Sequence, residues 1–184
     1  MDITGSLVRL RALRADDAPR MAELLADPRV VEHLDHWSRP PYSEARAAQW
    51  VTAALPDTIH WAIECREDGA YIGNTGLVTI DHHNRHCAWG IWIAPPERWG
   101  RGYGTEACML AVEYAFSELA MEKVTLELYA GNARGRGAYA KAGFTTEGML
   151  RRQHWSGGGL VDVEIMAVFR DNPLYARRIA RIAE

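Results

Sequence analysis

The sequence WGRGYGTEA at positions 99–107 places a glycine at every second position from 100 to 104, just before an apolar stretch with helical spacing. Glycine has no Cβ atom, so successive backbone N–H groups can converge on an anion. The N-terminal end of a helix adds partial positive charge at the same place. The run predicts a site for a phosphate-bearing ligand; its alternative is a turn that only joins two elements.

The segments before the glycines predict a strand, two helices and then three strands. The three strands are separated by clusters of turn-forming residues, which favours an antiparallel meander. The last of them, Ala88–Ile93, is apolar at nearly every position, which predicts a strand covered on both faces and central in its sheet. The predicted strands span residues 7–13, 59–65, 71–80 and 87–94, and the helices begin near Asp16 or Asp17 and at Ser43.

The segments after the glycines predict a crossover. A long helix carries apolar residues at positions 107, 110, 111, 114 and 115, and residues 124–129 then alternate as a strand. A strand, a helix and a second strand in this order imply that the two strands are parallel. A short helix over 132–142 and a hairpin of residues 145–154 and 160–169 follow.

Composition bounds the class of protein. A length of 184 residues fits one domain spanning 1–184. A net charge of -3 argues against nucleic acid as a partner. Three widely separated cysteines in apolar sequence predict buried thiols and a reducing, cytoplasmic setting. No uninterrupted apolar run is long enough to span a bilayer, so no membrane association is expected.

Two other phosphate-binding motifs compare poorly with the glycine run. Gly102, Gly104 and Ala107 satisfy a dinucleotide fingerprint, but residues 95–98 separate them from the preceding strand and no second half of a doubly wound fold follows. A P-loop lacks its closing Gly-Lys-Ser/Thr.

The segment IWIAPPERWGRGYGTEA at 91–107 resembles the acetyl-CoA-binding segment of the GNAT superfamily of N-acetyltransferases, whose pattern is Arg/Gln-x-x-Gly-x-Gly/Ala. Trp99, Gly102 and Gly104 occupy its three defined positions. Trp99 departs from the usual Arg or Gln, and the RimJ/RimL-like branch, which acetylates protein N-termini, shares this departure and the following Thr-Glu-Ala. Residues 126–132 and 138–148, which include Tyr-x-Lys-x-Gly-Phe, resemble the second half of the family, so the similarity covers nearly the whole chain.

The resemblance implies a mixed α/β (α+β) GNAT fold: a central sheet of about seven strands, an antiparallel meander followed by a splayed parallel pair, and flanking helices. It also implies acetyl-CoA as co-substrate and no metal. The pantetheine arm would pair with the backbone of residues 92–94, and the diphosphate would lie on the amides of the glycine run. The expected cofactor-binding residues are Trp92, Ile93, Ala94, Trp99, Gly100, Arg101, Gly102, Tyr103, Gly104, Thr105 and Asn132.

By the same resemblance, Tyr139 is the candidate acid that protonates the departing thiolate, and Glu127 the candidate base, acting directly or through water. Three of these residues have a structural alternative. Tyr139 could be a packing aromatic, Glu127 a salt-bridge partner on the sheet, and the cofactor-binding candidate Asn132 a helix cap. His33 and Trp37 are expected to line the acceptor pocket.

The expected function is transfer of acetyl to a primary amine by direct attack, with a peptide or protein N-terminal amine as acceptor. Polyamines and aminoglycosides are the alternative acceptors. A non-catalytic CoA-binding regulator and an NAD-binding oxidoreductase are the alternatives from other classes. A homodimer is compatible with the resemblance, but no sequence feature requires it.

Overall fold

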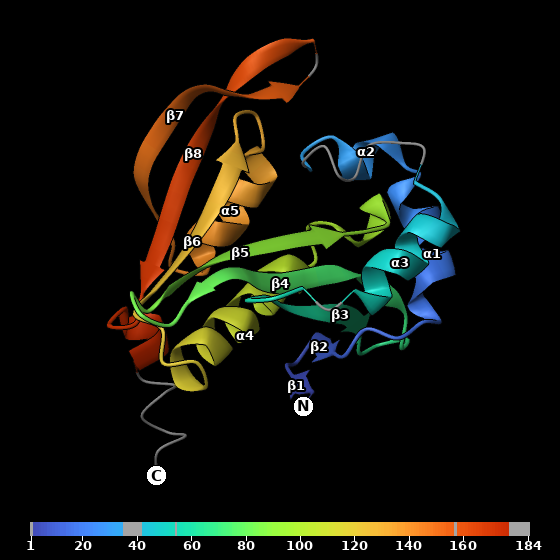
Figure 1. Cartoon of the computed structure of the whole chain (residues 1–184), viewed down its shortest axis with the longest axis horizontal. Helices are drawn as coiled ribbons and strands as arrows, with labels where there is room; N and C mark the ends of the chain where they lie inside the picture. The colour runs from blue at the N-terminus through green and yellow to red at the C-terminus, as the bar shows by residue number, and fades with distance from the viewer. Residues whose placement is uncertain (1, 35–41, 54, 157, 177–184) are drawn as a thin grey trace.

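The computed structural model describes residues 2–34, 42–53, 55–156 and 158–176 (Figure 1). Its strands form one sheet in the order β1-β2-β3-β4-β5-β6-β8-β7, and among the described neighbours all pairs are antiparallel except β5 and β6. The predicted mixed sheet, with its meander and its parallel pair, is thereby confirmed. The strands are β1 (Ile3–Thr4), β2 (Val8–Arg11), β3 (Ile59–Cys65), β4 (Tyr71–Asp81), β5 (His86–Ile93), β6 (Lys123–Tyr129), β7 (Thr145–Ser156) and β8 (Gly159–Phe169).

The helices follow the predicted order, with two short additions. The sequence patterns did not predict α2 or the 3-10 helix η2, because segments of three or four residues show no period. The two-residue strand β1, the eighth in the described sheet, was missed for the same reason. The helices are α1 (Asp17–Leu25), α2 (Pro28–Val31), α3 (Glu44–Thr52), η2 (Pro96–Arg98), α4 (Tyr103–Ser117) and α5 (Ala133–Lys141).

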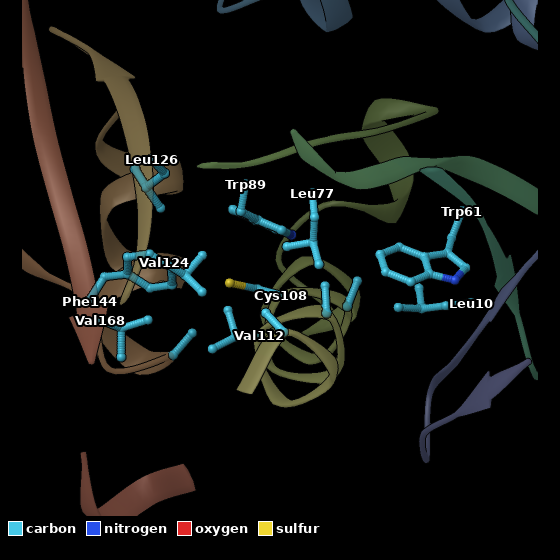
Figure 2. Close-up of a cluster of buried hydrophobic side chains, with 14 of the residues drawn as sticks. Leu10, Trp61, Leu77, Trp89, Cys108, Val112, Val124, Leu126, Phe144 and Val168 are labelled. Atoms are coloured by element: carbon cyan, nitrogen blue, oxygen red, sulfur yellow. The ribbon is translucent and has the colours of Figure 1, made fainter. Parts of the chain in front are cut away.

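The sheet is covered by different helices on its two faces. Cys108 and Val112 of α4 pack beneath Leu77, Trp89 and Val124 (Figure 2). The opposite face, reached by alternate residues of the same strands, packs against α1 and α3. All three cysteines are buried and free, as predicted. Within the described ranges, we find no helix with the length and apolarity that crossing a membrane requires.

The parallel pair β5–β6 opens shortly after it begins. Pairing runs only from His86 opposite Lys123 to Ala88 opposite Thr125. Beyond that point β5 stays beside β4 and β6 stays beside β8, and Figure 1 shows the two strands diverging. The prediction that β5 is covered on both faces fails at Gly90, which is exposed and has open space where a Cβ would stand, whereas Trp92 further along the strand is buried.

Candidate active site

A cavity of about 1020 Å³ lies where the glycine run, the start of α4 and the start of α5 meet. Gly100 and Gly102 adopt left-handed backbone with φ of +76° and +89°. A Cβ at Gly100 would meet no atom within 4 Å, so the loop surface there is open. The N–H groups of the first turn of α4 have no acceptor within the helix. The loop and the helix start thus present unpaired donors to the cavity, as an anion site requires.

Most residues predicted to bind the cofactor line this cavity. Two do not: Ala94 is fully buried and its N–H donates to the carbonyl of Ile72 at 2.8 Å, and Arg101 is exposed outside the lining. Those in the lining are Trp92, Ile93, Trp99, Gly100, Gly102, Tyr103, Gly104, Thr105 and Asn132.

The strand register determines which main-chain groups face the gap between β5 and β6. In an antiparallel ladder, successive residues point their N–H and C=O groups to opposite edges. Because Ala94 donates to Ile72 of β4, Trp92 also faces β4, whereas Ile91 and Ile93 face the gap. The carbonyl of Ile93 accepts a hydrogen bond from Trp99 Nε1 at 2.6 Å. Of the predicted segment 92–94, Ile93 is therefore the residue whose backbone is directed toward a ligand in the gap.

Charged side chains surround the same cavity, and several have protein partners. The carboxylate of Glu106 accepts hydrogen bonds from the N–H groups of residues 6, 7 and 8 at 2.8, 2.6 and 2.8 Å, which ties β2 to α4. Arg98 pairs with Asp68, and Arg66 donates to the carbonyl of Gly5 at 2.9 Å. Arg134 and Lys141 of α5 add two further cations to the lining.

A second cavity of about 380 Å³ opens between β4, β5 and β6. Its floor is the cross-strand pair Gly76 and Gly90, where neither strand carries a side chain. His60 packs edge-on against Trp50 with ring centroids 5.1 Å apart, and burial lowers the pKa of His60, so this imidazole is neutral at pH 7. Glu127 is the single acidic residue among the described residues that line this cavity.

Tyr139 lines both cavities and stands at their junction. Its ring packs edge-on against Trp89 with centroids 5.4 Å apart. Burial raises the pKa of Tyr139 above its ordinary value of 10.0, so the phenol keeps its proton at neutral pH. His33 also lines both cavities, whereas Trp37 lies outside the described residues.

Asn132 acts as the cap of α5. Its side chain accepts a hydrogen bond from the N–H of Gly135 at 2.9 Å, and it lines both cavities. A Cβ at Gly135 would lie 2.8 Å from Asn132 Nδ2, so this glycine allows the cap to form. Gly137 has open space where a Cβ would stand. The helix thus forms despite its two internal glycines, and at these two positions no side chain projects from α5 into the first cavity.

The sequence patterns missed the contribution of α5 to the first cavity. Arg134, Ala138 and Lys141 recur at helical spacing and line it. The helical spacing of these three residues is visible in the sequence. The sequence does not show which face of α5 lines the cavity, and the structure supplies that information.

Comparisons with known proteins identify relatives over most of the chain. A family model described as "Acetyltransferase (GNAT) domain" matches residues 8–145. The "Putative ribosomal N-acetyltransferase YdaF" of Bacillus subtilis is 29% identical over 154 residues, which cover 78% of this chain and 81% of that protein. Spermidine N(1)-acetyltransferase of Escherichia coli K12 is 29% identical over 169 residues, which cover 89% of this chain and 86% of that protein.

A solved structure shares the fold. It is that of spermidine N-acetyltransferase from Vibrio cholerae in complex with CoA and spermine, with a TM-score of 0.81 and 23% identity. The match covers 91% of this chain and 98% of that one.

Proposed function

The chain belongs to the GNAT family of acetyltransferases, and we propose that its acceptor is a peptide or protein N-terminal amine, as in the RimJ/RimL-like branch. The chain is an acetyl-CoA-dependent N-acetyltransferase, and this family membership displaces the NAD-binding oxidoreductase as an alternative. The acceptor is the open part of the assignment, because the named relatives include both a ribosomal and a spermidine acetyltransferase.

The first cavity fits acetyl-CoA. It combines the open glycine loop, the unpaired amides at the start of α4 and cationic side chains, which suit the phosphates of CoA. The backbone N–H groups of the loop that contains Gly100, Gly102 and Gly104 would donate hydrogen bonds to the diphosphate. Ile93, whose main chain faces the gap, would pair with the pantetheine arm. Acetyl-CoA supplies an activated thioester.

Glu127 in the second cavity and Tyr139 at the junction of the two cavities would divide the proton transfers between them. Glu127 would accept the proton that an ammonium must lose before it can attack, directly or through water. Tyr139, neutral at pH 7, would hold a proton on Oη for the leaving sulfur. The backbone N–H groups freed by the divergence of β5 and β6 would stabilise developing negative charge on the acetyl oxygen.

The charge of the second cavity carries the acceptor proposal. A polyamine bears several ammonium groups, and desolvating each of them requires an anionic partner. Glu127 is the one carboxylate among the described lining residues, while the neutral His60 and the indoles of Trp50 and Trp92 form apolar walls. This lining suits a single amine attached to an uncharged body. A peptide N-terminus fits, and its pKa of about 8 leaves a useful neutral fraction at pH 7.5.

The test is acetyl transfer measured as free-thiol release, with tripeptides, spermidine and an aminoglycoside as separate acceptors. We expect the highest kcat/KM for a tripeptide with an uncharged first side chain. Glu127→Gln should lower kcat for every acceptor and leave CoA affinity unchanged. A higher kcat/KM for spermidine than for every peptide would overturn the proposed acceptor.

A further inference from the structure

Arg134 and Trp99 form a stacked pair inside the first cavity. The guanidinium carbon of Arg134 lies 3.5 Å from the centroid of the Trp99 ring, within the range of a cation–π contact. The indole is itself fixed, because its Nε1 donates to the carbonyl of Ile93 at 2.6 Å. Both side chains line the cavity that begins at the glycine run. The pair joins α5 to the loop before α4.

Among the described residues Arg134 forms no ion pair at contact distance, and the carboxylate of Glu32 acts on it only through longer-range attraction. Two nearby arginines, one on the same helix and one in the cavity lining, do form ion pairs with carboxylates. Arg136 pairs with Glu164 at 3.1 Å, and Arg98 pairs with Asp68. For Arg134 the described residues provide a ring on one side and no ion pair. Partial desolvation lowers the pKa of Arg134, and the attraction of Glu32 offsets this effect only in part.

An arginine stacked on an aromatic ring is oriented for a ligand. The ring holds the guanidinium plane, and the five N–H donors remain at its edges. Phosphate oxygens match this fork and form charge-assisted hydrogen bonds with it. Trp99 stands where the family pattern usually has Arg or Gln, so this position carries an aromatic ring on which a guanidinium can stack in place of a polar side chain.

We infer that Arg134, held by Trp99, is a CoA-binding residue that donates hydrogen bonds to a phosphate of CoA from α5, beside the glycine run. In this arrangement α5 supplies by way of Arg134 the positive charge that position 99 does not carry. Trp99 is then a positioning residue, which acts through Arg134. CoA has two phosphate locations, the diphosphate and the 3′-phosphate, and the same guanidinium chemistry suits either.

The test is calorimetric binding of CoA, 3′-dephospho-CoA and pantetheine to the full chain. Arg134→Met should weaken CoA binding by about tenfold to a hundredfold, the loss of a charge-assisted contact. Pantetheine has no phosphate, so the variant and the wild type should bind it equally. A loss that persists with 3′-dephospho-CoA assigns the diphosphate; a loss that disappears with it assigns the 3′-phosphate.

Two controls separate this contact from a general charge effect. Arg136→Met removes a cation from the same helix outside the cavity lining and should leave CoA affinity within twofold. Trp99→Phe keeps a ring and should weaken CoA binding less than Trp99→Leu, which removes the platform. Thermal unfolding without ligand verifies that each variant is folded.

Three results would overturn the inference: equal CoA affinity in wild type and Arg134→Met, an equal loss with pantetheine, or an equal loss in Arg136→Met. None of these outcomes depends on which amine is acetylated.

Discussion

Replacing Tyr139 by Phe removes one oxygen atom from the junction of the two cavities. The ring contacts with Trp89 and Phe144, at centroid distances of 5.4 and 6.5 Å, can stay in place. The free energy of unfolding should therefore change by less than about 1 kcal/mol. If the phenol supplies a proton to the leaving sulfur, kcat should fall by about a hundredfold, within the usual range for general acid catalysis.

The pH dependence gives an independent check on Tyr139. Burial raises its pKa above 10.0, so the phenol holds its proton up to a higher pH than a free tyrosine. A general acid that stays protonated contributes no falling limb between pH 6 and 9. Wild type and Tyr139→Phe should thus show pH profiles of the same shape, displaced by a constant factor.

The assay is free-thiol release from acetyl-CoA with a saturating peptide, together with calorimetric CoA binding. Tyr114→Phe is the matched control, because Tyr114 packs on Trp61 at 5.2 Å and lines neither cavity. A kcat within threefold of wild type would remove Tyr139 from its role. A parallel loss of CoA affinity would show that the residue only shapes the cofactor site.

Four further substitutions test the fold and the second cavity. Gly90→Ala should raise the acceptor KM at unchanged CoA affinity, since its Cβ enters open space on the cavity floor; unchanged kinetics would contradict that location. Gly137→Ala should raise the free energy of unfolding by up to about 1 kcal/mol in urea titration, because the helix gains a better former without a clash. Glu106→Gln should lower it by about 2 kcal/mol, because one amide oxygen replaces a carboxylate that accepts three N–H groups. Asp17→Asn should lower it by about 3 kcal/mol, because the buried guanidinium of Arg11 loses its bidentate anion; a loss under 1 kcal/mol would show that Glu64 alone suffices.

Local patterns predicted the elements that have a clear period. The strand over 59–65 and the helix after the glycine run appear in the structure as expected, because apolar spacing and glycine placement are read within one segment. The divergence of β5 and β6 followed from the resemblance to the GNAT family, not from periodicity.

Features that depend on two distant segments were not predictable in the same way. The stacking of Arg134 on Trp99 requires α5 to approach the loop before α4, and no local pattern encodes that distance. The failed prediction at Gly90 has a similar origin: its exposure depends on the second cavity, which residues of several distant segments line together. The direction of the Ile93 main chain needed the register with β4.

The most direct test of the proposed function is a competition for one pool of acetyl-CoA. A tripeptide with an uncharged first side chain and spermidine are supplied at equal concentration, and mass spectrometry quantifies both acetylated products and locates the acetyl group. The single carboxylate in the described lining of the second cavity predicts that the peptide product dominates by tenfold or more, with acetyl on its α-amine. Dominant N-acetylspermidine, or acetyl on a side chain of the peptide, would contradict it.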